Sequence, residues 1–175
     1  MRMIGMIGLL ALIGCNTAPT SETDKKAQAS EVESTIAKFE KEQAAVKVYM
    51  EDAHAYAVFP TVGKGGMGVG GAFGRGQVFQ GGKQIGYAKL TSASIGFQLG
   101  GQSFSEIIFF QDKAAFDRFK SGEFGFDANA SAVAATAGAA AKADYKDGVA
   151  VFVMSDAGLM YEASIGGQKF DYEAK

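Results

Sequence analysis

The sequence predicts an α+β fold, a strongly curved antiparallel β-sheet (barrel- or sandwich-like) with an N-terminal amphipathic helix and a short inserted helix. Three patterns predict it: a glycine-rich region with strand-like alternation, an apolar helical stripe before it, and a capped helical segment between two strand regions. The 175 residues hold 24 glycines and 14 phenylalanines but only two prolines and no tryptophan. We therefore expect a core dominated by phenylalanine and turns made by glycine.

The N-terminus carries an apolar segment, Met3 to Ile13, that ends just before the only cysteine, Cys15. It is far shorter than the about 20 residues that span a bilayer, and it fits the apolar part of a secretory signal. Leu12-Ile13-Gly14-Cys15 resembles the lipobox of bacterial lipoproteins. The alternative is an ordinary signal peptide with a chance cysteine. We expect residues 1–14 to be a lipoprotein signal peptide and Cys15 to be the lipidation site.

Lipidation of Cys15 has consequences for chemistry and location. The modified sulfur is lost to disulfides, metal ions and nucleophilic catalysis. Because Asn16 rather than Asp follows the cysteine, the lipobox resemblance implies a bacterial outer-membrane protein that is lipid-anchored and faces the periplasm. Residues 15–30 are polar and without periodicity, so we expect a flexible tether there. Residues 31–175 then form a single domain, of a size that buries a proper core.

The domain should begin with a helix. Ser30 and Glu33 form a capping box, and an apolar stripe follows at helical spacing. The stripe residues are Val32, Ile36, Phe39, Val46 and Met50. The stripe could lie on a membrane, but the interval 31–52 holds six acids and three lysines, whereas membrane-surface helices are usually basic. We expect it to pack against the protein's own sheet.

Strand patterns follow from residue 55. Residues 57–60 form a short apolar run that we expect Pro60 to end, and residues 63–86 contain eleven glycines. Gly81-Gly82 predicts a hairpin turn, after which a strand continues through residues 83–90 and alternates through residues 92–100. Residues 104–110 end in a fully apolar run, which is typical of a central strand buried on both faces.

The rest of the chain predicts a helix and then more strands. Asp112 caps a short helix that buries Ala115, Phe116 and Phe119 and that ends at Gly122. Residues 127–143 hold ten alanines, which favour a helix, but their alternation also suits a strand, and we prefer the strand. Three final strands are expected to form a meander. They span residues 149–154, 159–165 and 168–172.

No pattern in the sequence indicates catalysis, so we expect a protein that is not an enzyme and needs no cofactor or metal. Residues 66–71 fit the letters G-x-G-x-x-G, but a dinucleotide site needs a helix after them, and more strand follows. His54 is the only histidine and is expected to cap or pack the end of the first helix. The net charge of −2 argues against a nucleic-acid partner.

The charge distribution offers one candidate site. The stretch from Val58 to Phe104 contains no acid, and it holds four cations within an acidic protein. They are Lys64, Arg75, Lys83 and Lys89. If these side chains converge, they form a site for an anion or a phosphate. The alternative is four solvated cations dispersed over the surface.

Several blocks follow one another in a defined order: residues 57–71 with Gly74-Arg75-Gly76, residues 94–102, residues 107–119, the alanine tract from Asp127, residues 155–159 and residues 164–167. In this order they resemble the SYLF family of lipid-binding and actin-binding domains. The resemblance implies one globular domain that binds membrane lipids. In a bacterial protein neither actin nor a phosphoinositide is an expected partner. The basic N-terminal segment of eukaryotic members is replaced here by an acidic helix.

These patterns lead to two main hypotheses. The first is a non-enzymatic, membrane-anchored lipoprotein whose domain binds an anionic phospholipid or another amphiphile through the four cations. The alternative is a structural or protein-interaction module of the cell envelope without a lipid ligand. A hydrolase is a third and weaker alternative, because no catalytic motif supports it.

Overall fold

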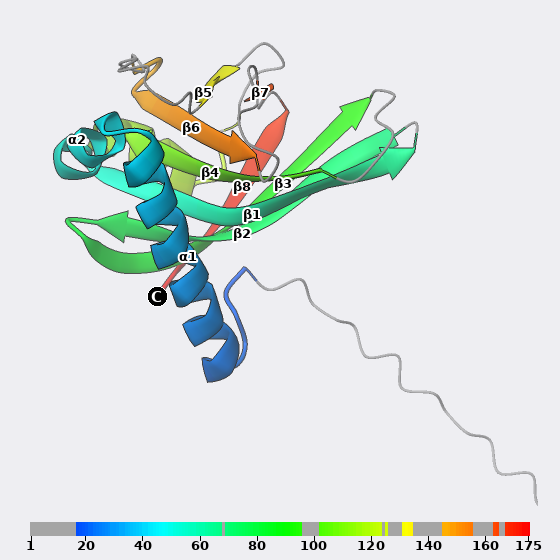
Figure 1. The fold of residues 1–175 in the computed structure, drawn as a ribbon, viewed down its shortest axis with the longest axis horizontal. Helices are drawn as coiled ribbons and strands as arrows, with labels where there is room; N and C mark the ends of the chain where they lie inside the picture. The colour runs from blue at the N-terminus through cyan, green and yellow to red at the C-terminus, as the bar shows by residue number, and fades with distance from the viewer. Residues whose placement is uncertain are drawn as a thin grey trace, which may run out of the picture.

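The computed structural model describes residues 17–67, 69–95, 102–123, 125, 131–134, 145–155, 163–164 and 167–175 (Figure 1). Helices and strands are combined in an α+β fold, as expected. The helices are α1 (Glu22–Glu42), α2 (Ala45–Asp52) and α3 (Lys113–Lys120). The strands are β1 (Ala55–Met67), β2 (Val69–Gln80), β3 (Lys83–Ile95), β4 (Gln102–Phe110), β5 (Ser131–Ala134), β6 (Val149–Ser155), β7 (Ala163–Ser164) and β8 (Gln168–Ala174).

The strands form one sheet in the order β7-β5-β6-β4-β1-β2-β3-β8. The six strands from β6 to β8 in that order are all antiparallel, which confirms the predicted antiparallel sheet. At the other end β5 runs parallel to β6, and β7 runs antiparallel to β5. Within the described residues no ladder joins β7 to β8. The sheet is therefore open, and the expected barrel- or sandwich-like form is not supported.

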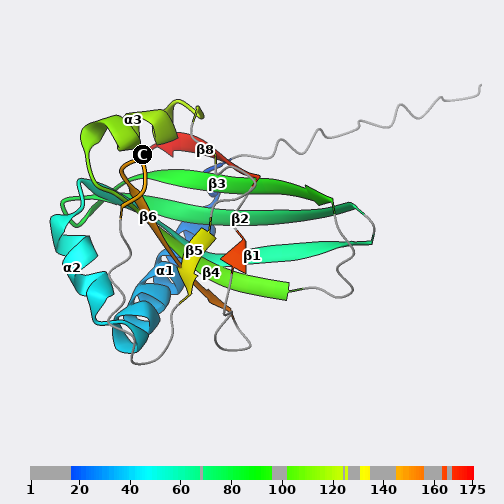
Figure 2. The same ribbon diagram turned by 90° about the horizontal axis from the view of Figure 1, so that it is seen from above.

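The sheet is strongly curved around its inner face. The rings of Phe59 on β1 and Phe170 on β8 are 5.8 Å apart between centroids. These strands are three positions apart in the sheet, which would separate them by about 14 Å if the sheet were flat. Helix α3 closes the concave side, because Phe119 lies 4.8 Å from Phe110 and 5.4 Å from Phe170 (Figure 2).

One polar pair lies within this inner apolar cluster. Gln168 on β8 donates a hydrogen bond from Nε2 to Oε2 of Glu106 on β4, at 3.0 Å, and both side chains are buried. The bond joins strands four positions apart in the sheet order, so it crosses the concave side. The inner face is thus held by aromatic packing and by one buried polar link.

Glycine permits this curvature, as the sequence predicts. A Cβ at Gly76 would lie 2.3 Å from the carbonyl oxygen of Val58, and one at Gly86 would lie 2.5 Å from the ring of Tyr172. Neither distance is possible for a real side chain, so backbone and ring approach closely only because these positions lack one.

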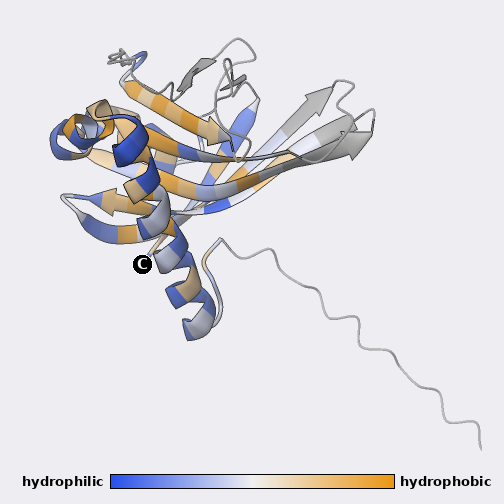
Figure 3. Cartoon of the chain, in the orientation of Figure 1, coloured by the Kyte–Doolittle hydropathy of each residue, from blue (hydrophilic) through white to orange (hydrophobic). Residues whose placement is uncertain are grey.

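The outer face of the sheet packs against α1 and α2 (Figures 1 and 3). The predicted apolar stripe is confirmed, because all five of its residues belong to the cluster between these helices and β1, β4 and β6. The helix is interrupted, however. Gln43 takes an extended conformation, and a second helix begins at Ala45. The stripe therefore packs against the protein's own sheet from two helices.

The predicted start of the first helix was wrong. Helix α1 begins at Glu22, so the last part of the expected tether is helical. The side chain of Ser21 accepts a hydrogen bond from the backbone N–H of Asp24, at 3.0 Å, and the acidic first turn suits the helix dipole. Ser30 lies inside the helix and caps nothing.

Several local predictions are confirmed. Gly81 and Gly82 form the β2–β3 turn with φ values of 56° and 74°. The side chain of Asp112 caps α3, and Gly122 follows it with φ of 73°. The four residues from Ile107 to Phe110 are fully buried in the middle of the sheet. Of residues 127–143 the structure describes 131–134, which are a strand.

Two predictions about the strands were wrong. Pro60 does not end a strand, because β1 continues to Met67 and the register shifts around the proline form a bulge. The last three strands do not form a meander either. Strand β6 pairs with β4, β7 pairs with β5, and β8 pairs with β3. Cys15 and residues 96–100 of the predicted alternating strand lie outside the described residues.

Candidate functional site

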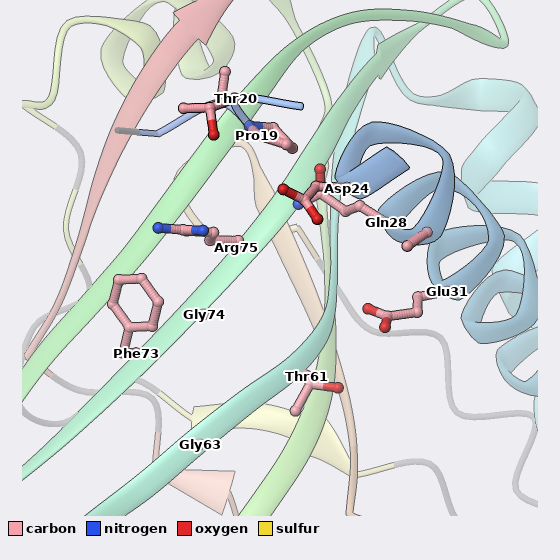
Figure 4. A pocket seen from close by; sticks show the side chains of 12 residues that line it. Pro19, Thr20, Asp24, Gln28, Glu31, Thr61, Gly63, Phe73, Gly74 and Arg75 are labelled. Carbon is pink, nitrogen blue, oxygen red and sulfur yellow. The ribbon is translucent and has the colours of Figure 1, made fainter. Parts of the chain in front are cut away.

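A groove of about 630 Å³ lies between the N-terminal half of α1 and the outer face of β1 and β2 (Figure 4). It is lined by Ala18, Pro19, Thr20, Asp24, Ala27, Gln28, Glu31, Thr61, Gly63, Phe73, Gly74 and Arg75. Its volume is in the range of natural small-molecule sites. The groove exists because the apolar contact between α1 and the sheet begins only at Val32, so the first turns of the helix are not packed onto the strands.

The segment before α1 forms one end of the groove. Ala18 donates its backbone N–H to Oε2 of Glu173 on β8, at 3.2 Å, which ties this segment to the edge of the sheet. Pro19 and Thr20 continue from there to the helix cap. The first described residues of the chain therefore lie beside the groove.

The sheet wall combines an aromatic ring with a cation. Phe73 is 45% exposed, which makes it one of two exposed large apolar side chains among the described residues. The guanidinium carbon of Arg75 lies 5.7 Å from the centre of that ring, a cation–π distance. Arg75 is exposed, and it forms no ion pair with any described residue. This wall offers an apolar surface and a guanidinium side by side.

The helix wall is polar and acidic. Asp24 and Glu31 are exposed on α1, seven residues apart and therefore on one side of the helix. Gln28 lies between them and is only 9% exposed. Its Oε1 is buried and has no hydrogen-bond partner within the described residues. The two walls of the groove therefore carry opposite charges.

The structure brings two of the four predicted cations together. Arg75 and Lys89 are direct partners in the β2–β3 register, and Nζ of Lys89 lies 2.9 Å from Oδ2 of Asp171 on β8. Lys83 lies next to the β2–β3 hairpin turn. It is six residues before Lys89 on the same strand, which separates the two by about 20 Å. In the β1–β2 register Lys64 pairs with Ala72, and Thr61 pairs with Arg75. Lys64 is therefore three positions along the ladder from Arg75. Only Arg75 lines the groove.

The sequence did not indicate the helix wall or Phe73. Asp24 and Gln28 fall within the segment expected to be a tether, where no helical spacing is looked for. Asp24, Gln28 and Glu31 are spaced by four and then three residues, which places them on one side of a helix. This spacing was the signal in the sequence that could have identified the helix wall. Phe73 lies in the glycine-rich strands, where its exposure depends on which face α1 covers.

Other candidate residues have local structural roles. His54 follows α2, donates its backbone N–H to the carbonyl of Phe110 at 2.9 Å, and places Nε2 2.9 Å from Nε2 of Gln80. The ring of His54 also lies 6.1 Å from the ring of Phe116, which agrees with its predicted packing role. In the G-x-G-x-x-G stretch Met67 pairs with Val69, so strand β1 leads into strand β2 and not into a helix. The prediction that a strand follows this stretch is therefore confirmed, and the helix that a dinucleotide site needs does not follow it.

The described part of the chain shows neither a metal cluster nor a membrane-spanning helix. No group of three or more His, Cys, Asp or Glu side chains there is placed to hold a metal ion. Among the same residues no helix is both long and apolar enough to cross a membrane.

Comparison with known proteins gives two results. Residues 91–174 match the family Ysc84, described as "Las17-binding protein actin regulator". The chain is also 30% identical over 134 residues to Beta cell expansion factor A of Aeromonas veronii, a match that covers 74% of this chain and 49% of that protein. The chain thus spans about half the length of this curated relative. Together with the ordered blocks in the sequence, these matches show that the chain belongs to the SYLF (Ysc84) family.

Proposed function

We propose that this protein is a non-enzymatic lipoprotein, anchored through acylated Cys15, whose SYLF domain binds phospholipid head groups in the groove beside α1. Membership of the family supports a lipid- or actin-binding module. The proposal adds the ligand, the anchor and the location, which is the periplasmic side of a bacterial outer membrane. Arg75 is the central contact for the phosphate.

The observation that carries the proposal is the position of the groove relative to Cys15. Ala18 lines the groove and is tied to β8. Three residues of extended chain span at most about 11 Å, so acyl chains on Cys15 would hold the groove within that distance of the anchor. A doubly or triply acylated cysteine anchors stably, because each buried methylene contributes about 0.8 kcal/mol. The groove is then beside the head-group layer.

The sheet wall suits a phospholipid head group. A guanidinium binds phosphate oxygens through paired hydrogen bonds, and the exposed ring of Phe73 offers apolar surface next to it. Lys89 is beside Arg75 in the register but is paired with Asp171. In this proposal Lys89 adds positive potential beside the groove rather than a contact inside it, whereas Lys83, about 20 Å from Lys89, is too far away to contribute.

The alternative, an envelope module that docks a protein, has less support. Val48 on α2 is the other exposed large apolar side chain among the described residues. A single exposed valine is ordinary for a soluble surface and does not form a docking patch. Phe73, in contrast, is exposed beside a cation and within a groove. This difference favours the amphiphile.

Vesicle flotation with residues 17–175 tests the proposal. This fragment holds both hydrophobic clusters and every described contact, and it lacks both the apolar signal and Cys15. We expect it to float with phospholipid vesicles at low salt. Arg75→Glu should reduce the bound fraction at least about tenfold, because it replaces an attraction to phosphate by a repulsion.

Lys146→Glu is the matched control. Lys146 is exposed near the start of β6, away from the groove residues, and the substitution changes the net charge by the same amount. It should leave flotation within about twofold, as expected for a remote surface charge under screening. Absence of flotation with every vesicle, or equal losses in both variants, would refute lipid binding in the groove.

A further inference from the structure

The groove carries charges of both signs, and their arrangement is informative. Arg75 lies on the sheet wall, and Asp24 and Glu31 lie on the helix wall (Figure 4). A site for a purely anionic head group would gain nothing from two carboxylates on its opposite wall, since they weaken the binding of any anion. The acidic wall therefore needs an explanation beyond phosphate binding.

The helix wall also departs from the pattern of its own helix. Farther along α1 the side that faces the sheet is mainly apolar, with Val32 and Phe39 buried in the outer cluster and Thr35 buried beside them. At the groove the corresponding side carries Asp24, Gln28 and Glu31. Gln28 is nine-tenths buried, and its Oε1 lacks a hydrogen-bond donor within the described residues. A buried acceptor without a donor is costly, so a ligand that drew the Gln28 amide toward the groove and donated to it would gain a hydrogen bond. The acceptors that the wall exposes are the carboxylates of Asp24 and Glu31.

We propose that the groove selects a zwitterionic head group of the phosphoethanolamine type. The phosphate binds Arg75, and the ammonium group binds against the carboxylates of Asp24 and Glu31. Oε1 of Gln28 is closed off from solvent in this structure, so the side-chain amide would have to turn toward the groove to accept a hydrogen bond from the ligand. An ammonium group has three donors and no acceptor, which matches a wall of acceptors. This inference rests on the proposed function, because it names the lipid class that the same groove binds.

The size and the aromatic surface of the groove fit this ligand. A volume of about 630 Å³ accommodates a glycerophosphoethanolamine unit. Phe73 covers the apolar carbons between the two charges, while Arg75 already lies over its ring. A phosphoglycerol head group fills the same space, but it places hydroxyl groups rather than a cation against the two carboxylates.

The test compares vesicles of phosphatidylcholine that contain either phosphatidylethanolamine or phosphatidylglycerol. For residues 17–175 we expect about fivefold tighter binding to the first, decreasing as salt is added. Part of that preference arises from the negative net charge of the protein. The double variant Asp24→Asn/Glu31→Gln should lose the part of the preference for phosphatidylethanolamine that comes from the two carboxylates. Its remaining preference should be the part that the net charge of the protein causes.

Glu33→Gln/Glu42→Gln is the control for net charge. Both residues are exposed on α1, neither lines the groove, and the pair changes the net charge equally. This control should retain more of the preference than the groove variant does. Equal behaviour of the two double variants would overturn the inference and leave the proposed function standing. Failure of the unmodified fragment to bind either vesicle would refute the proposed function itself.

Free head groups identify the source of the ligand. Amide resonances of Gly63, Gly74 and Arg75 should shift with glycerophosphoethanolamine and not with glycerophosphoglycerol if the head group alone is recognised. Shifts that require phosphatidylethanolamine vesicles would identify the bilayer lipid as the ligand. Equal shifts with both soluble compounds would contradict selection of the ammonium group.

Discussion

The two faces of the sheet differ in how fully other elements cover them. The inner face curves around a continuous apolar cluster that α3 closes, and its polar link is the pair Glu106 and Gln168. The outer face is apolar only where the later turns of α1 and α2 cover it. Beyond them it carries Phe73 and Arg75 at an open groove, whose other wall is the start of α1 with Gln28. The inner face thus serves stability, while the outer face divides between stability and binding.

The difference shows how one helix can serve both purposes. Where α1 packs into the outer cluster, its sheet-facing residues are mainly apolar, as in an ordinary amphipathic helix. Where it leaves the sheet, the same side becomes polar. Binding surface is therefore obtained by shortening the apolar contact rather than by adding a separate element.

The largest expected effect comes from a substitution on the inner face. Phe110 is fully buried against Phe116 and Phe119, so Phe110→Ala should lower the free energy of unfolding by about 3–5 kcal/mol. Phe73→Ala on the outer face should change it by only about 0.5 kcal/mol but should weaken vesicle binding. Urea denaturation followed by circular dichroism measures both. Similar losses of stability would contradict the division between the faces.

Glycine substitutions sharpen the comparison at intermediate magnitude. Gly76→Ala places a Cβ against the carbonyl of Val58, and we expect a loss of about 1–3 kcal/mol because the backbone must shift. Gly63 lies on the outer face, where an added Cβ would have no described atom within 4 Å, so Gly63→Ala should be nearly neutral. Thermal unfolding of the two variants gives the contrast. A neutral Gly76→Ala would show that the inner face is looser than these distances indicate.

The smallest effect concerns the outer cluster at high pH. Burial, with the neighbouring Tyr49 and Asp52, raises the pKa of Tyr145 to about 12, and its hydroxyl has no partner among the described residues. Because the unfolded pKa is near 10, its contribution to stability is complete below pH 10 and is lost as the pH rises toward 12. Tyr145→Phe should therefore show a shallower loss of unfolding free energy above pH 10. Identical slopes would argue against a buried hydroxyl.

Local features of the fold could be predicted from the sequence. The Gly81-Gly82 turn, the caps of α3 and the buried run at Ile107 depend on neighbouring residues, and all three are confirmed. The partners of the final strands could not be predicted, because pairing of β8 with β3 joins residues about 80 positions apart. The start of α1 was misplaced because Ser30 and Ser21 both begin acceptable capping patterns, and only tertiary contacts decide between them.

The candidate site was predictable only on its sheet wall. Arg75 stands out because it lies in a long stretch without acids, and it does line the groove. Lys83 belongs to the same stretch but lies at the hairpin, since position along a strand determines distance more than composition does. Asp24 and Gln28 lie opposite the sheet wall only because α1 begins at Glu22 and crosses the outer face. Their helical spacing was visible in the sequence, but the crossing depends on tertiary contacts.

The pairing of β8 also sets the order in which the chain acquires its structure. Phe170 pairs with Leu90 and completes the inner cluster, so a nascent chain lacks a closed core until residues 168–174 have been synthesised. Contacts this distant in sequence form slowly. If the N-terminal signal directs secretion as proposed, this delay keeps the polypeptide unfolded during translocation and postpones folding until it has reached its destination.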